Sequence, residues 1–261
     1  MKAVRQGSTG EEVFYLQRLL CERGYVVSVD GLFGPRTYEA VCRFQEDAKL
    51  VVDGVVGPNT WHALTGLVQE EAPPDFTKAA QTLNIEVAAI RAVHQVETGG
   101  SSGFLPDGRP LILFEGHIFW GQLKKKGIEP TRYQKGNEDI LFPSWNAKSY
   151  KGGTAEFDRL LRACVINHEA ALMSASWGMF QIMGFNYGLC EFDSVYKYAA
   201  TMHINHKKQL RAFVKFLQKT KLDTLLREHR WEEFAKQYNG PFYKENQYDE
   251  KLQAAYLQFS K

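Results

Sequence analysis

The chain has 261 residues, of which 44% are hydrophobic and 13% aromatic, so a packed core rather than disorder is the default expectation. Its 32 basic residues are nearly balanced by 30 acidic ones, which argues against a nucleic-acid-binding protein. No stretch is long and apolar enough for a membrane span, and the first residues do not form a signal peptide. We therefore expect a globular protein that neither binds nucleic acid nor inserts into a membrane.

No metal or other cofactor is predicted. His168-Glu169 is not followed by the second histidine of an HExxH zinc site, and no Gly-x-Ser-x-Gly element provides a nucleophilic serine. The cysteines show neither CxxC spacing nor a dense disulfide framework, and we predict that all are reduced core residues. They are Cys21, Cys42, Cys164 and Cys190.

An internal repeat opens the chain. Residues 30–37 (DGLFGPRT) and 53–60 (DGVVGPNT) are near-copies of one motif, and such a repeat defines a small module. In each copy a proline is placed to begin a helix, which predicts a bundle of about three short helices. Residues 67–75 then break the periodicity and contain Pro73-Pro74, as a stiff linker would. We predict domains over 1–66 and 76–261, joined by this linker.

The second domain is predicted to be mostly helical, with a small strand region near its beginning. Apolar positions in 85–97 share one helical face, Asn84 is placed as the cap of this helix, and Thr98-Gly99-Gly100 ends it. The apolar run 110–115 predicts a strand, whereas 121–153 is polar and rich in turns. Later helices are expected at about 154–171, 175–183, 193–218, 222–228, 231–238 and 246–259.

Two resemblances follow from these motifs. The repeats, with Gln17 and Phe44-Gln45, resemble the peptidoglycan-binding domain of cell-wall hydrolases over about residues 7–65. The remainder, from about residue 80, resembles the N-acetylmuramidase domain of bacteriophage endolysins. The motifs that carry the second resemblance are ETGG at 97–100, GFL at 103–105, DGRP at 107–110, LFEGHIF at 113–119 and SWGMFQI at 176–182.

The resemblance implies a mainly α fold, with a small three-helix peptidoglycan-binding domain and a lysozyme-like, mostly helical catalytic domain with a small β region. It implies an endolysin that hydrolyses the β-1,4 bond between N-acetylmuramic acid and N-acetylglucosamine and so lyses the host cell. Peptidoglycan is then the partner of what we expect to be a monomer. Such an enzyme waits in the host cytoplasm until it is released to the peptidoglycan of the periplasm.

Glu97 is the predicted general acid. It ends an apolar helical run, so one side of its carboxyl is expected to be dry, which raises a carboxyl pKa toward the value that proton donation requires. Gly99 and Gly100 let a polymer approach the backbone closely. The alternative is an ordinary glutamate at a helix end, where the helix dipole disfavours it.

Glu115 is the predicted second catalytic carboxylate, which orients a water, stabilises the developing cation or tunes Glu97. A structural ion pair, for example with Arg109, is the alternative, and Asp107 is a weaker candidate. By the same resemblance, the substrate-binding residues are expected to be Ser176, Gln181, His117, Tyr238 and Asn239. Those of the peptidoglycan-binding domain are expected to be Asp53, Gly54, Asn59, Thr60 and Trp61, although about half of these have local reasons to shape loops instead.

Three other functions remain open from the sequence. A lytic transglycosylase would cleave the same bond through the muramic 6-hydroxyl and release anhydro products. A non-catalytic wall-binding protein would leave peptidoglycan suspensions turbid. A zinc amidase or peptidase would release amino groups rather than reducing ends.

Overall fold

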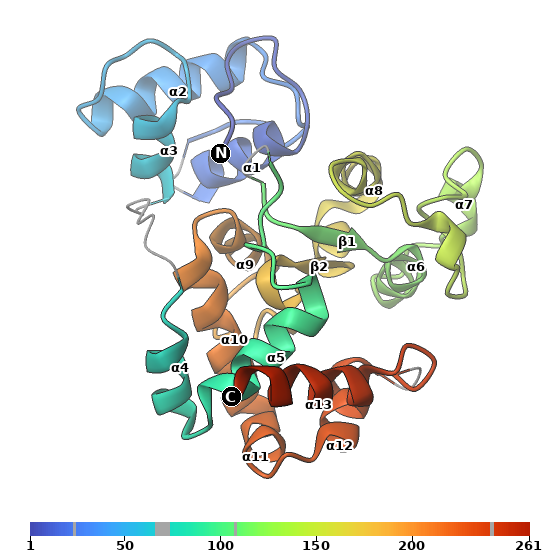
Figure 1. Cartoon of the computed structure of the whole chain (residues 1–261). Coiled ribbons are helices and arrows are strands. Elements are labelled where there is room, and N and C mark those ends of the chain that lie inside the picture. The colour runs from blue at the N-terminus through green and yellow to red at the C-terminus, as the bar shows by residue number, and fades with distance from the viewer. Residues whose placement is uncertain (23–24, 66–73, 107–108, 241–242) are drawn as a thin grey trace. The chain divides into compact units, whose positions relative to one another are not determined.

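The structure, a computed structural model, describes residues 1–22, 25–65, 74–106, 109–240 and 243–261 (Figure 1). Two compact units divide the chain. The first contains Met1–Glu70, Leu105–Arg109 and Leu113–Ala175, and the second contains Glu71–Phe104, Pro110–Ile112 and Ser176–Lys261. The mainly helical fold is confirmed, since the described residues form thirteen α-helices and three short strands.

Some predicted features lie outside the described residues. These are Asp107, the side chain of Cys21 and nearly all of the predicted linker, of which only Pro74 and Asp75 are described. Asp75 is the N-cap of α4 (Phe76–Leu83), where its carboxylate accepts from the Lys78 amide at 3.0 Å. The domain boundaries at 66 and 76 stay predictions.

Three helices form the N-terminal module: α1 (Glu11–Glu22), α2 (Pro35–Asp47) and α3 (Pro58–Thr65). Both repeat prolines begin a helix, as predicted, because their fixed φ suits a first helical turn. The module encloses a core of its own. Its fully buried side chains include Val13, Leu16, Leu20, Val41, Val56 and Leu64.

The rest of the first unit leads to Glu115. Helix α8 (Ala155–Met173) carries the fully buried Glu156, whose carboxylate accepts from the Phe114 amide at 3.0 Å and pairs with Arg159 at 2.7 Å. Because a buried charge is stable only when it is paired, this network fixes the end of strand β1 (Ile112–Phe114). Glu115 follows as the N-cap of α6 (Gly116–Lys125). The polar, turn-rich stretch 121–153 contains helix α7 (Thr131–Gln134) and the 3₁₀ turn η1 (Ala147–Ser149).

The second unit surrounds helix α5 (Val87–Thr98), which packs against α4 and against α13 (Tyr248–Phe259), red in Figure 1. Ala88, Ala89, Ala92 and Val93 are its buried face, in line with the predicted periodicity. The remaining helices are α9 (Val195–Met202), α10 (His206–Thr220), α11 (Leu222–Arg227) and α12 (Trp231–Tyr238). In the described part of the chain, no helix combines the length and apolar character that crossing a bilayer requires.

The helix predicted over 175–183 is wrong. This segment forms strand β2 (Ala175–Trp177), the 3₁₀ turn η2 (Gly178–Phe180) and strand β3 (Ile182–Met183). β2 and β3 pair antiparallel in a sheet of order β1-β2-β3. The physical reason lies in the turn, where Gly178 has φ +70° and Gln181 has φ +46°, values that no right-handed helix contains.

Two helix boundaries also differ from the prediction. The single helix expected over 193–218 is broken between α9 and α10, where the Asn205 side chain accepts from the Lys208 amide at 3.0 Å and caps α10. Asn84 does not begin α5; it ends α4 in the left-handed conformation, with φ 52°. Asparagine tolerates this conformation because its side chain can bond locally, which is why it serves at either end of a helix.

Candidate functional site

Glu97 occupies the last turn of α5, one residue before the helix ends at Thr98, and Gly99 caps the helix with φ 63°. The side chain is half-buried. Burial raises the pKa of the Glu97 carboxyl from 4.5 to about 7, against the opposing effect of a hydrogen bond from Asn239. A carboxyl with this pKa keeps its proton through much of the neutral range, as a general acid must.

Asn239, the C-cap of α12, is the polar partner of Glu97. Its Nδ2 donates to Glu97 Oε1 at 2.8 Å across 142 positions of sequence. Its Oδ1 is buried and accepts no hydrogen bond among the described atoms. A buried acceptor without a donor costs free energy, so the placement of Asn239 beside Glu97 is locally destabilising.

Hydrogen bonds connect the turn η2 to the helices that carry Glu97 and Asn239. Thr98 Oγ1 donates to the Met179 carbonyl at 3.4 Å, and the Tyr238 hydroxyl donates to the Phe180 carbonyl at 2.6 Å. Tyr238 also packs its ring against those of Phe213, Phe216 and Phe234. Its hydroxyl therefore positions the turn, and its role in lining a cleft stays a prediction.

Ser176 and Gln181 are brought together, as neighbours in one internal network. Ser176 Oγ donates to Gln181 Oε1 at 2.8 Å, while Gln181 Nε2 donates to the carbonyls of Gly178 at 2.8 Å and Leu111 at 3.3 Å. Both ends of the Gln181 amide are thus engaged within the protein. In this arrangement the pair fixes the β2–β3 turn, and sugar binding by either residue stays a prediction.

Sequence reasoning missed Gln209 of α10, which holds the same turn from the other side. Its Oε1 accepts from the Met179 amide at 2.8 Å, and its Nε2 donates to the Met202 carbonyl at 2.8 Å. It is only 2% exposed. Gly103 and Gly178 both leave room for it: a Cβ on Gly178 would lie 2.6 Å from Gln209 Cδ. No sequence motif singles out Gln209, whose contact with the turn at Met179 spans 30 positions.

Glu115 lies in the first unit, in a cluster of its own. Its carboxylate accepts a short hydrogen bond from the Tyr150 hydroxyl, and His117 Nδ1 is 3.3 Å from the same oxygen. The His117 ring also stacks on Phe142, with the centroids 6.5 Å apart. Burial, with the Glu115 carboxylate, raises the pKa of Tyr150, so Tyr150 stays a neutral donor. Arg109, the partner considered from sequence, lies over the ring of Phe157 at 4.2 Å.

Trp145 and Tyr150 extend this cluster and were missed, because the sequence around them has no periodicity. Trp145 is 54% exposed and lies near Tyr150, whose hydroxyl donates to Glu115. An exposed aromatic ring offers an apolar face that can contact a sugar ring.

The two repeats fold into equivalent loops, each built around a buried glutamine. Gln45 Nε2 donates to Asp53 Oδ1 at 2.9 Å, to the Val55 carbonyl at 3.0 Å and to Thr60 Oγ1 at 3.1 Å, and Gln45 Oε1 accepts from the Gly54 amide at 2.9 Å. Gln17 makes the same contacts in the first repeat, with Asp30, Gly31, Leu32 and Thr37.

This network accounts structurally for most of the residues predicted to bind peptidoglycan. Asp53, Gly54 and Thr60 shape the loop, and hydrogen bonds from the Val55 amide and Gln45 lower the pKa of Asp53. Trp61 is 3% exposed, stacks on Tyr15 and donates to the Lys2 carbonyl at 3.0 Å. Asn59 is exposed and lines, together with Asp53 and Thr60, a cavity of about 320 Å³. Ligand binding by the five residues stays a prediction.

Among the described residues, no group of three His, Cys, Asp or Glu side chains is arranged to hold a metal ion. Cys42, Cys164 and Cys190 are free, as predicted, although Cys42 is only half-buried. Burial raises the pKa of the Cys190 thiol to about 12, so it stays protonated. The chemistry that Glu97 offers is proton donation by a carboxyl.

Comparisons with known proteins agree with this chemistry. Residues 86–260 match the N-acetylmuramidase family, and residues 9–64 match a peptidoglycan binding domain. The crystal structure of Burkholderia AP3 phage endolysin is similar, with 38% sequence identity, 99% coverage of both chains and a TM-score of 0.64.

A shorter likeness is found to a peptidoglycan-binding protein from Clostridioides difficile, at 44% identity over 24% of this chain and 40% of that chain, with a TM-score of 0.24. A search of curated proteins found no match. Because the family match covers more than half of the 261 residues, this chain belongs to the N-acetylmuramidase family and carries an N-terminal peptidoglycan-binding domain.

Proposed function

We propose that this endolysin cleaves the β-1,4 bond between N-acetylmuramic acid and N-acetylglucosamine with Glu97 as the general acid. The observation that carries the proposal is the half-buried Glu97 at the end of α5, bonded to Asn239 at 2.8 Å, where burial raises its pKa to about 7. Glycoside hydrolysis needs a carboxylic acid that is protonated when the substrate binds and can lose its proton to the leaving oxygen.

Asn239 serves both stages of this proton transfer. Its N–H donates to Glu97 Oε1, so the proton of the neutral acid belongs on Oε2 and can face the glycosidic oxygen. Once the proton has left, the same N–H stabilises the carboxylate. Without such a donor, the pKa of Glu97 would be higher and the proton would be released less readily.

Glu115 is proposed as the second carboxylate, which orients water or stabilises the oxocarbenium-like transition state. The support for this role is its orientation: Tyr150 holds one carboxylate oxygen, and His117 lies beside it. A carboxylate oriented in this way is placed to meet the positive charge that develops in the transition state.

The N-terminal module is proposed to hold the enzyme on the insoluble polymer. Attachment raises the local concentration of the catalytic domain without changing its chemistry. We propose further that the protein acts as a monomer, accumulates in the host cytoplasm, and reaches the peptidoglycan of the periplasm after release. The resemblance to phage endolysins supports this sequence of events.

The test replaces each acid by its neutral isostere. Loss of a general acid costs about 100-fold or more in rate, so Glu97→Gln should nearly abolish lysis of permeabilised cells. Glu115→Gln should lower the rate strongly, whereas Glu245→Gln, an exposed glutamate of the second unit, should leave it unchanged. Turbidity measures all three. Normal lysis by the Glu97 variant would refute the assignment.

A further inference from the structure

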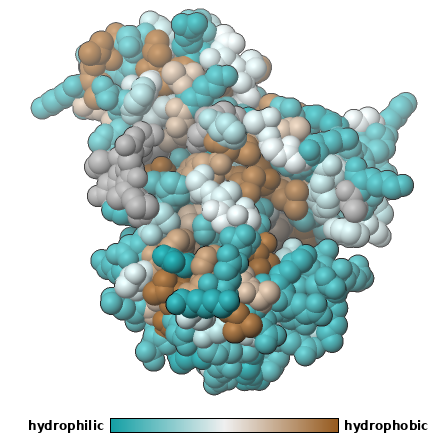
Figure 2. All heavy atoms as spheres, viewed as in Figure 1, coloured by the Kyte–Doolittle hydropathy of each residue, from teal (hydrophilic) through white to brown (hydrophobic). Residues whose placement is uncertain are grey.

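The side chain of Gln209, in the first turns of α10, is enclosed within the second unit and bonded to main-chain groups of two other elements. Its Oε1 accepts from the Met179 amide of η2, and its Nε2 donates to the Met202 carbonyl of α9, both at 2.8 Å. Figure 2 shows hydrophilic residues over much of one face of the protein, but Gln209 is only 2% exposed and belongs to no such surface. Both ends of its amide therefore meet a group of the opposite kind, away from water.

Two glycines leave the space that this amide occupies. A Cβ on Gly178 would lie 2.6 Å from Gln209 Cδ, and a Cβ on Gly103 would lie 2.6 Å from Gln209 Oε1. Both glycines have positive φ, +70° and +74°. Because the backbone approaches closely from two separate segments, the amide has a narrow range of allowed positions. The Asn205 side chain caps α10 one turn earlier, which fixes the start of the helix that carries Gln209.

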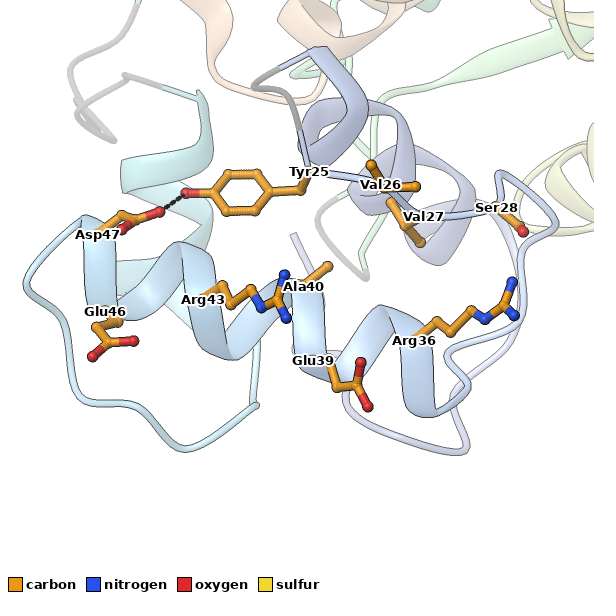
Figure 3. Close-up of a pocket in the computed structure, with 10 residues that line it drawn as sticks. All are labelled: Tyr25, Val26, Val27, Ser28, Arg36, Glu39, Ala40, Arg43, Glu46 and Asp47. Carbon is orange, nitrogen blue, oxygen red and sulfur yellow. Dashed lines mark hydrogen bonds between the residues drawn. The ribbon is translucent and has the colours of Figure 1, made fainter.

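An open cavity of the N-terminal module provides a contrast. Its volume is about 600 Å³, and the charged residues that line it are all exposed (Figure 3). They are Arg36, Glu39, Arg43, Glu46 and Asp47, so both signs of charge alternate along α2. Water competes for each of these groups, whereas the two hydrogen bonds of Gln209 have no such competition.

Met179 connects Gln209 to the neighbour of the candidate acid. The Met179 amide donates to Gln209, and the Met179 carbonyl accepts from Thr98 Oγ1 at 3.4 Å. Thr98 directly follows Glu97 and ends α5. A displacement of Met179 would therefore be transmitted to the last turn of α5.

The next residue of η2 connects the same turn to Asn239. The Phe180 carbonyl accepts from the Tyr238 hydroxyl at 2.6 Å, and Tyr238 directly precedes Asn239. Asn239 depends on such support, because its buried Oδ1 accepts no hydrogen bond among the described atoms. The contact between Asn239 and Glu97 therefore persists because the surrounding structure holds it.

We propose that Gln209 is a positioning residue, which holds Glu97 and Asn239 at the separation that proton transfer requires. The inference rests on the proposed role of Glu97 as general acid. Gln209 acts through η2, to which the chain neighbours of both residues are bonded. Because a catalytic group works only within a narrow range of positions, loss of these bonds lowers the rate even when the fold persists.

Gln209→Met tests the proposal, because methionine has a similar length but makes neither hydrogen bond. For the full-length protein acting on soluble peptidoglycan fragments, we expect kcat to fall about tenfold and KM to stay within about twofold. The alkaline limb of the kcat/KM profile should move up by about half a pH unit, since a displaced Asn239 stabilises the Glu97 carboxylate less well. Circular dichroism should show the parent fold, because Phe180 still stacks on Phe213 of α10.

Gln209→Glu provides a rescue that depends on pH. A neutral carboxyl has an O–H donor and a carbonyl acceptor, so it can make both bonds, whereas the ionised form has no donor for the Met202 carbonyl. This variant should match the parent at acidic pH and lose activity relative to the parent as the introduced carboxyl ionises. Gln218→Met and Gln218→Glu, at an exposed position of the same helix, are the matched controls and should follow the parent at every pH.

The outcomes separate this inference from the proposed function. Normal activity of Glu97→Gln would remove the general acid itself, whatever the Gln209 variants do. If Glu97→Gln is inactive, an unchanged kcat and alkaline limb in Gln209→Met refute the positioning role. A loss of activity that only follows the loss of folded protein also refutes it. If Gln209→Met does not fold, Gln209→Glu decides, and an activity relative to the parent that is the same at every pH overturns the inference.

Discussion

Glu97 shows how one residue acquires an acid's function from its surroundings. Burial raises its pKa to about 7, and a hydrogen bond from Asn239 opposes that rise. The balance between these effects sets the pH range in which the acid is both protonated and able to release its proton.

The pH dependence of activity tests this balance. A general acid must be protonated, so the rate should fall as pH rises through the Glu97 pKa of about 7. Asn239→Leu removes the donor that favours the carboxylate, so the pKa should rise and the alkaline limb of the kcat/KM profile should move up by about one pH unit. A limb that stays in place or moves to lower pH would contradict the role of Asn239.

At the scale of single residues, the sequence predicted where Glu97 lies in its helix but not which side chain it contacts. Glu97 could be placed because a helical face and the glycines that end it are local signals. Its bond to Asn239 spans 142 positions and depends on the fold of the whole second unit. Tyr150 and Trp145 were missed beside Glu115 for the same reason, since nothing in the local pattern marks them.

At the scale of elements, the turn between β2 and β3 is the structure around which the site is built. Local propensity suggested a helix here, but Gln209, Thr98 and Tyr238 all bond to η2 from other helices. Tertiary hydrogen bonds therefore override the helical pattern. Gly178 is the local sign of a turn in this segment, because glycine readily adopts a positive φ.

Gly178→Ala tests how tightly this turn is fitted. With φ +70°, and Gln209 Cδ only 2.6 Å from the site of a Cβ, the substitution adds both backbone strain and overpacking. We expect a loss of about 2–4 kcal/mol in the free energy of unfolding, measured by urea denaturation. Gly188→Ala is the control, since a Cβ there meets nothing within 4 Å. Equal effects of the two substitutions would contradict the argument.

Gln45→Glu tests the loop of the second repeat. The change keeps the size of the side chain but replaces the Nε2 donor by an oxygen that faces the Asp53 carboxylate, the Val55 carbonyl and the Thr60 hydroxyl. Because Gln45 is 1% exposed, the new charge is buried and repelled, at a cost of about 3 kcal/mol to the module. Glu46→Gln, at the exposed neighbouring position, is the control. Equal unfolding temperatures of the two variants would show that the Gln45 hydrogen bonds do not stabilise the loop.

At the scale of the whole molecule, the order of parts was the feature most accessible from sequence. An internal repeat is visible without any knowledge of contacts, and both repeat prolines begin the helices that they were expected to begin. The compact units are less accessible, because each is assembled from segments that are separated along the chain. Such an arrangement depends on contacts that periodicity does not encode.

An acid catalyst that a wall-binding module holds on peptidoglycan should release one kind of product. Mass spectrometry of purified peptidoglycan after digestion measures it most directly. The account predicts muropeptides that end in a reducing N-acetylmuramic acid with one water added per bond cleaved, and none after digestion with the Glu97→Gln protein. Products lighter by one water would indicate a transglycosylase, and intact glycan strands with cut peptide stems would contradict the central claim.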